Sequence, residues 1–329
     1  MFFQKAFEGE NQVWKWILTP VMAIVGYTFG QIPLGIAMVF YMAKNDVMTS
    51  YSEAEIQELL TKMDFAALGM DLNLTLFLLL LMFVFMALAL IFFLKIFHKR
   101  NWKTLITPLE KIDWGKIGFS FMLWLAFTMG LEAFSYYTEP EVYTLTFEWS
   151  KFLPLLLIVI LLMPIQTTTE ELLFRGYLMQ GFGRWTGSKL FAILITSLLF
   201  SGMHMMNPEV AEFGIGIMFT YYASVGFFLG LLTAMDDSLE LAIGVHAATN
   251  MFSAIFVSYA GGALQTNAIF RTEVVNVELM LPIFFVIAAI FFMICWKKYN
   301  WEGWSRLLEP IKPPPIVEPQ IPDLPNINP

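Results

Sequence analysis

Charged residues are scarce in this chain. Only 14% of its 329 residues are Asp, Glu, Lys or Arg, whereas 58% are hydrophobic. A soluble protein of this size has about 25% charged residues, so the composition indicates an integral membrane protein. The net charge of −8, without any long Lys/Arg run, argues against nucleic-acid binding.

Cysteine is almost absent as well. The single cysteine, Cys295, excludes a disulfide framework and a cysteine-based metal site. The N-terminal stretch "MFFQKAFEGENQVWK" has no apolar run before a small-residue cleavage site, so we expect no cleavable signal peptide.

Long apolar runs dominate what is present. Runs of about 20 apolar residues are typical of membrane-spanning helices, and the sequence predicts about eight of them. They lie near residues 17–43, 73–97, 117–137, 152–183, 189–206, 214–235, 240–259 and 279–296. The predicted fold class is therefore an all-α, polytopic transmembrane helix bundle. The fourth run is too long for one simple span, and we expect Pro164 to kink or break it.

The basic residues predict an orientation for this bundle. With the N-terminus inside, 14 of the 19 Lys and Arg residues fall on inner segments and 4 on outer loops, while Arg175 lies within a helix. Because Lys and Arg concentrate on cytoplasmic loops, we expect a multi-pass protein of the inner or plasma membrane with both termini in the cytoplasm.

The chain is expected to have four parts. Residues 1–150 hold N-terminal transmembrane helices and an outer segment in which Ser52 and Glu55 form a capping-box pattern before a short amphipathic helix. Residues 151–260 hold the polar positions considered next, and residues 261–300 hold the last transmembrane helix. Residues 301–329 form a proline-rich cytoplasmic tail, which is either an extended, mobile segment or a docking site for a protein partner.

Three charges interrupt the apolar pattern in "TTTEELLFRG", residues 167–176. A charge at the centre of a membrane costs roughly 2.5–3.5 kcal/mol even on the lenient insertion scale. Glu171 and Arg175 are four residues apart and can pair on one helix face. Glu170 lies about 100° around the helix and has no such partner, so we expect it to face another group. The preceding threonines are interpreted as a new helix start after Pro164.

Histidine is also scarce, with three in the chain. His98 lies in the cytoplasmic flank "FHKR", whereas His204 and His246 lie in or close to predicted spans. His246 and Asn250 are four apart and share a helix face. The turn "GRWTGS" around Gly187 predicts an antiparallel hairpin of spans four and five, which brings Glu170 and His204 to similar heights.

These residue types suit the activation of water. A carboxylate can act as a general base, and an asparagine amide can donate to a tetrahedral oxyanion. Glu170, His204 and His246 are also suitable ligand types for a zinc site. The sequence has no HExxH helix, and the spacing alone does not decide whether a metal is bound.

The three motifs together resemble a known family. "EELLFR", "FSGMH" and "HAATN" match the EExxxR, FxxxH and HxxxN motifs of the CAAX-protease and bacteriocin-processing intramembrane proteases, also called the abortive-infection family. The resemblance covers residues 151–259 and makes residues 151–260 the expected protease core. It implies an intramembrane endopeptidase in which Glu170 and His204 activate water, and His246 and Asn250 form the oxyanion hole.

The same resemblance implies that Glu171 and Arg175 hold the site together. It also implies a membrane-associated or prenylated protein substrate within the bilayer, and it leaves a metallo-mechanism open. Two alternatives remain at this point. One is a non-proteolytic scaffold or partner-complex subunit that keeps the polar network. The other is a proton-relaying transporter, which would require paired broken helices in inverted repeats.

Overall fold

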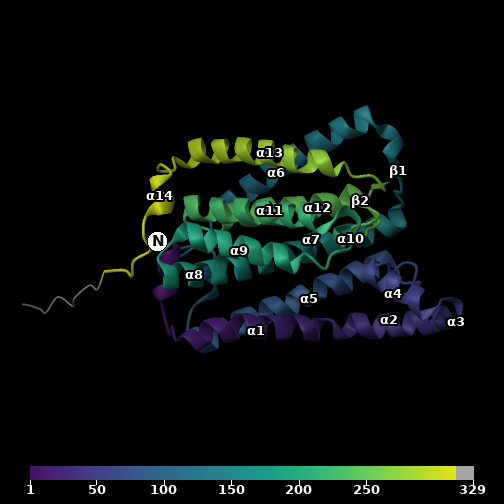
Figure 1. Ribbon diagram of the computed structural model, residues 1–329, viewed down its shortest axis with the longest axis horizontal. Coiled ribbons are helices and arrows are strands. Elements are labelled where there is room, and N and C mark those ends of the chain that lie inside the picture. Colours follow the sequence, from purple (N-terminus) through teal and green to yellow (C-terminus); the bar gives the residue numbers. More distant parts are fainter. Residues whose placement is uncertain (316–329) are drawn as a thin grey trace, which may run out of the picture.

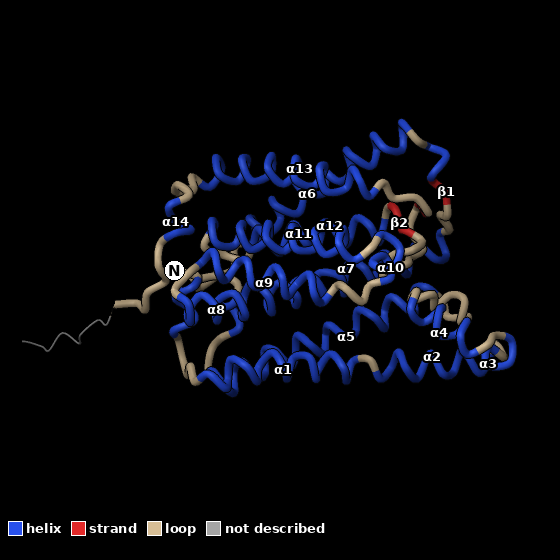
Figure 2. The backbone as a smooth tube through the Cα atoms, in the orientation of Figure 1, coloured by secondary structure: helices blue, strands red, loops and turns tan. Residues whose placement is uncertain are grey.

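The long helices lie side by side along the longest axis of the molecule, and the loops gather at its two ends (Figures 1 and 2). The computed structural model describes residues 1–315. The α-helices are α1 (Val13–Gly30), α2 (Ile32–Lys44), α3 (Val47–Ser50), α4 (Glu53–Thr61), α5 (Leu72–Phe93), α6 (Trp114–Thr138), α7 (Trp149–Glu171), α8 (Met179–Thr186), α9 (Lys189–Met203), α10 (Pro208–Phe213), α11 (Ile215–Asp236), α12 (Glu240–Ile255), α13 (Val277–Tyr299) and α14 (Ser305–Leu308).

Other elements are short. The 3-10 segments are η1 (Phe3–Phe7), η3 (Trp102–Leu105) and η4 (Pro140–Val142), and the π-helical segments are η2 (Leu94–His98) and η5 (Leu172–Leu178). The strands β1 (Tyr143–Leu145), β2 (Val257–Tyr259) and β3 (Phe270–Thr272) form a small sheet in the order β1-β3-β2. β3 pairs antiparallel with β1 and parallel with β2.

Six helical stretches in residues 1–315 are long and apolar enough to cross a membrane. They are Val13–Lys44, Leu72–His98, Trp114–Thr138, Trp149–Thr186, Ile215–Asp236 and Val277–Tyr299. The two other predicted spans correspond to the shorter helices α9 and α12. The predicted all-α, polytopic bundle is therefore confirmed.

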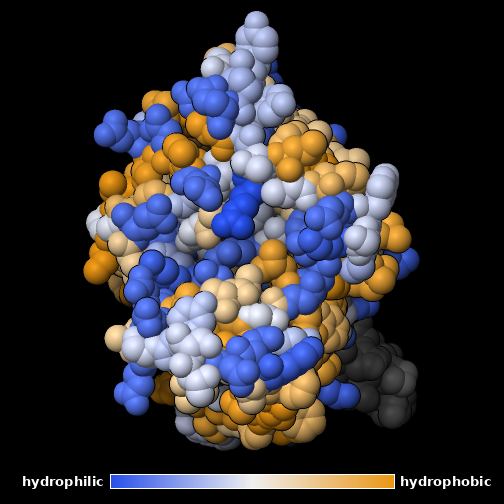
Figure 3. All heavy atoms as spheres, turned by 90° about the vertical axis from the view of Figure 1, so that its right-hand side faces the viewer, coloured by the Kyte–Doolittle hydropathy of each residue, from blue (hydrophilic) through white to orange (hydrophobic). Residues whose placement is uncertain are grey.

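The surface of the bundle fits a membrane environment. Large aliphatic side chains along the helices are exposed, including Ile36, Leu88 and Leu157 at 66%, 62% and 62%. Hydrophilic side chains gather instead on the end of the molecule that carries β1 and α3 (Figure 3). Apolar flanks beside a polar end are expected of a bundle whose sides contact lipid, so the chain is an integral membrane protein.

Helix α12 lies at the centre of this arrangement. It packs against α6, α7 and α11, and its residues 240–248 are all buried. Gly244 allows the approach to α6, because a Cβ there would lie 2.0 Å from Ser120 Oγ and 2.4 Å from the Ile117 carbonyl oxygen. Protein surrounds this half of α12, so its polar side chains do not face lipid hydrocarbon.

Of the kink or break expected at Pro164, the break is wrong. α7 continues through Pro164 to Glu171, and η5 and α8 extend the same helical run to Thr186. The threonines do not start a new helix, because their hydroxyls donate back to carbonyls of the preceding turn: Thr167 to Met163 (3.1 Å) and Thr169 to Ile165 (2.6 Å). Membrane helices tolerate proline where neighbouring helices and such hydroxyls support the backbone.

Two local expectations are confirmed. Helix α4 begins with a complete capping box, in which Ser52 Oγ accepts from the Glu55 backbone N–H and Glu55 Oε2 accepts from the Ser52 N–H at 2.7 Å. The turn between spans four and five is also present. α8 ends at Thr186, Gly187 takes the left-handed conformation with φ 71°, and α9 begins at Lys189.

Part of the expected tail packs onto this turn. The Ile311 backbone N–H donates to the Gly187 carbonyl at 2.8 Å, and Lys189 Nζ donates to the Arg306 carbonyl at 2.6 Å. This first part of the tail is therefore anchored to the hairpin. The remainder of the predicted proline-rich tail, residues 316–329, lies outside the described residues.

Substitution of Gly244 should test the α6–α12 contact. We expect Gly244→Ala to lower the free energy of unfolding by about 1–3 kcal/mol, because overpacking forces the backbones apart. The matched control is Gly118→Ala on α6, where nothing lies within 4 Å of the added Cβ. Thermal unfolding in detergent measures both variants, and equal midpoints for the two would contradict the close contact.

Candidate active site

The motif EExxxR forms a buried ion pair. Arg175 Nη1 donates to Glu171 Oε1 at 2.7 Å, and both side chains are 0% exposed. Arg175 Nη2 donates to the Gly226 carbonyl of α11 at 3.2 Å, and the guanidinium lies over the ring of Phe200 on α9, 4.4 Å from its centroid. The predicted pairing is confirmed, and it joins three helical segments.

The ion pair lies where α7 changes geometry. Glu171 is the last residue of α7, and Arg175 lies within the π-helical segment η5. π-helical turns inside α-helices occur frequently at functional sites. The sequence pattern did not predict η5, because the visible helix-breaking signal was Pro164, further back in α7.

His246 of α12 lies between the two glutamates. Its Nδ1 is 2.8 Å from Glu171 Oε1, and its Nε2 is 3.6 Å from Glu170 Oε2. An ionised carboxylate only accepts hydrogen bonds, so Nδ1 donates to Glu171. This contact fixes the ring with Nε2 toward Glu170.

A third residue of α7, Gln166, completes the network. Gln166 Nε2 donates to Glu170 Oε1 at 2.6 Å, and Asn250 Nδ2 donates to Gln166 Oε1 at 3.0 Å. Sequence reasoning missed Gln166, although it precedes Glu170 by four residues and is polar within an apolar run. The same spacing rule that paired Glu171 with Arg175 would have found it.

Two carboxylate oxygens at the centre, Glu170 Oε2 and Glu171 Oε2, have no hydrogen-bond partner within residues 1–315, and Glu170 Oε2 is the one near His246 Nε2. Glu170 Oε2 is buried, although the Glu170 side chain as a whole is 9% exposed. A separation of 3.6 Å from His246 Nε2 is longer than a direct hydrogen bond and suits a bridging water. This oxygen is therefore free to accept a hydrogen bond.

His204 lies beside this network without a hydrogen bond to it in the described chain. It caps the C-terminal end of α9, and its Nδ1 donates to the Phe200 carbonyl at 2.8 Å. Its ring stacks on Tyr222 of α11, with centroids 4.3 Å apart. Phe200 is the shared neighbour, because its ring centroid lies 4.4 Å from that of His204 and 6.2 Å from that of His246.

The candidate zinc ligands do not form a cluster. Among residues 1–315, no group of three or more His, Cys, Asp or Glu side chains is arranged to hold a metal ion. Both ring nitrogens of His246 face carboxylates, and His204 approaches the network only through Phe200. The side chains as placed do not fit a three-ligand zinc site.

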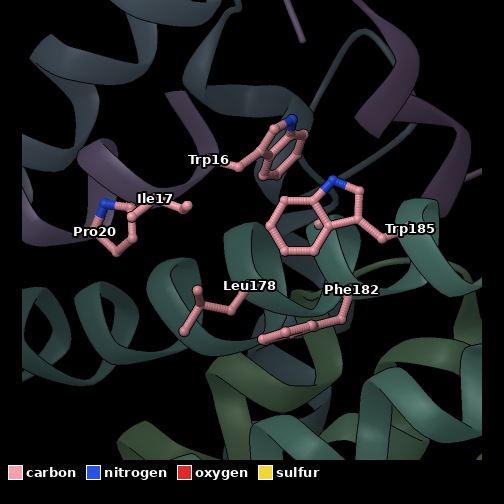
Figure 4. A pocket seen from close by; sticks show the side chains of 7 residues that line it. Trp16, Ile17, Pro20, Leu178, Phe182 and Trp185 are labelled. Atoms are coloured by element: carbon pink, nitrogen blue, oxygen red, sulfur yellow. The ribbon is translucent and has the colours of Figure 1, made fainter. Parts of the chain in front are cut away.

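A separate apolar pocket opens between α1 and the η5–α8 run (Figure 4). Its volume is about 200 Å³, and it is lined by Trp16, Ile17, Pro20, Leu178, Gly181, Phe182 and Trp185. None of the motif residues lines it. The pocket is therefore distinct from the polar site.

Comparisons with known proteins agree with the site. A family model described as "Type II CAAX prenyl endopeptidase Rce1-like" matches residues 149–252, a range that contains every motif residue and Gln166. The uncharacterized protein YyaK of Bacillus subtilis (strain 168) is 32% identical over 260 residues, which cover 78% of this chain and 82% of YyaK. No solved structure matches the chain. With this relative and with all three motifs gathered around one buried site, the chain belongs to the Rce1-like family of type II CAAX prenyl endopeptidases.

Proposed function

We propose that this protein is an intramembrane endopeptidase that hydrolyses a peptide bond of a membrane-associated or prenylated protein. The observation that carries the proposal is the unpaired, buried Glu170 Oε2, which faces His246 Nε2 in a site bordered by Asn250. A protease family and a carboxylate placed to accept a proton together favour hydrolysis.

The proposed reaction uses a water activated by the protein. Glu170 takes a proton from the water while the water oxygen bonds to the peptide carbonyl carbon. His204 orients the water through its Nε2, since its Nδ1 is held by Phe200. The carbonyl oxygen becomes an oxyanion, which an Asn250 amide hydrogen stabilises beside His246. Glu170 then gives the proton to the leaving nitrogen as the C–N bond breaks.

Glu171 and Arg175 have a supporting role in this proposal. Glu171 fixes the tautomer and the ring direction of His246, as a carboxylate does for many catalytic histidines. Arg175 balances the charge of Glu171 at full burial and is itself held by the Gly226 carbonyl. Neither side chain needs to touch the substrate.

The proposed location is the inner or plasma membrane, with both termini in the cytoplasm and the α3–α4 segment outside. The excess of Lys and Arg on the inner segments supports this orientation. Substrates would approach laterally from the bilayer or from the cytoplasmic side.

Loss of the base should abolish cleavage. We expect Glu170→Gln to lower kcat by about 10²–10⁴-fold, which is the usual contribution of a general base. The assay uses purified protein with a panel of prenylated and unprenylated membrane peptides, and metal content is measured on the same samples. Glu132→Gln is the control. Glu132 accepts a hydrogen bond from the Tyr143 hydroxyl at 2.7 Å and takes no part in the polar site. Full activity of Glu170→Gln would overturn the proposal.

Breaking the ion pair should destabilise the protein more than removing it. We expect Glu171→Gln or Arg175→Met alone to cost about 3–5 kcal/mol, because each leaves a buried charge uncompensated. The double variant should recover part of this loss. Thermal unfolding of the wild type, the two single variants and the double variant measures the coupling free energy. Additive losses of stability in the double variant would argue against the pair as the central support.

Cysteine labelling should report the orientation. In a Cys295→Ala background, Glu110→Cys should react with an impermeant maleimide only from the cytoplasmic side and Ser50→Cys only from outside. Both positions are exposed, and Cys295 is the only native thiol. The reverse pattern in sealed vesicles of known orientation would invert the proposed topology.

A further inference from the structure

We propose that Gln166 is a positioning residue that fixes the Glu170 carboxylate and the Asn250 amide relative to each other. This inference rests on the proposed function, because it assigns Gln166 to the same site. It adds a residue that lies outside the three motifs.

The direction of the two hydrogen bonds follows from the chemistry of the groups. An ionised Glu170 only accepts, so Gln166 must present its amide N–H to it and keep its carbonyl for the other neighbour. That carbonyl needs a donor, so Asn250 must present its amide N–H to Gln166. The result is a directed chain from Asn250 through Gln166 to Glu170, at 3.0 and 2.6 Å.

Each bond leaves the working atom of its partner free. The Asn250 amide nitrogen has two hydrogens, and Gln166 occupies one of them, so the other can meet an oxyanion. Gln166 occupies Glu170 Oε1, so Oε2 is the oxygen that faces His246 Nε2. One buried amide therefore sets the orientation of both the proton acceptor and the oxyanion donor.

No other side chain in residues 1–315 can replace this support. Within that range, Gln166 is the only side chain that hydrogen-bonds the Asn250 amide, and the only one within hydrogen-bond distance of the Glu170 carboxylate. It is 5% exposed, so bulk water does not readily substitute for it. The two hydrogen bonds also link two helices, since Gln166 and Glu170 lie one turn apart on α7 and Asn250 lies on α12.

The test removes both hydrogen bonds but keeps the length of the side chain. Gln166→Met should lower kcat by about 10–100-fold, since a misplacement of about 1 Å can cost that much, while KM stays within about threefold. Gln180→Met is the matched control. Gln180 is also buried, at 0% exposed; it accepts from Arg100 at 2.7 Å and donates to the Thr104 carbonyl at 2.9 Å, apart from the site. Its loss should lower the thermal unfolding midpoint and leave kcat within about twofold.

A second measurement does not depend on activity. The chain has only three histidines, so selective ¹⁵N-histidine labelling gives three pairs of ring nitrogen signals that single His→Gln variants assign. Gln166→Met should move the His246 signals, because Glu170 Oε2 lies 3.6 Å from His246 Nε2, and should leave those of His98 in place. Gln180→Met should do the reverse, because Arg100 lies over Trp16, whose ring contacts His98.

The outcomes separate this inference from the proposed function. A His246 signal unchanged by Gln166→Met, or an unchanged kcat in that folded variant, would overturn the positioning role. A shifted His246 signal with a selective fall in kcat would support it. If Glu170→Gln keeps full activity, the proposed function fails, and the histidine signals still decide whether Gln166 orients Glu170.

Discussion

The buried ion pair between Glu171 and Arg175 connects the helices on which the site is built. Arg175 reaches the Gly226 carbonyl of α11 and the Phe200 ring of α9, and Glu171 holds His246 of α12. A lone charge at full burial would be strongly unfavourable. Here the charges offset each other, and their remaining hydrogen bonds reach neighbouring helices. The pair thereby sets the direction of the His246 ring.

Such contacts require backbones that approach closely. Gly226 provides one approach, because a Cβ there would lie 3.0 Å from Ser197 Cα of α9. Gly244 provides another, between α12 and α6. Small residues at helix interfaces are the usual means of close packing in membranes, where the hydrophobic effect gives no drive for helices to associate. The polar centre and the glycine contacts therefore depend on each other.

The sequence predicted the elements of the site better than its connections. The apolar runs predicted eight spans, of which six correspond to stretches long and apolar enough to cross a membrane and two to the shorter helices α9 and α12, and the four-residue spacing predicted the Glu171–Arg175 pair. Gln166 was not predicted, because an uncharged amide stands out less than a charge in an apolar run. The sequence pattern also misplaced the irregularity of α7, because proline is a strong signal in isolation but tertiary support overrides it. The π-helical turn at η5 depends on packing partners distant in sequence, which no local pattern shows.

The amino-acid composition also did not predict that residues 301–315 pack against the bundle. Proline density indicates an extended chain, and an extended chain can still be anchored by single contacts. The hydrogen bond from Ile311 to Gly187 and the burial of Leu307 are contacts of this kind. The roles of Glu170, His204, His246 and Asn250 stay proposals that rest on their geometry and on the family.

The enclosure of α12 also has a consequence for biosynthesis. A segment with Glu240, His246 and Asn250 is poorly suited to dissolve in lipid alone. Its packing neighbours α6, α7 and α11 all precede it in the chain. Since the N-terminal part of a chain is made first, the whole polar lining that α12 needs has been synthesised when α12 emerges. The order of helices along the chain thus lets this polar-bearing helix be received by partners already made.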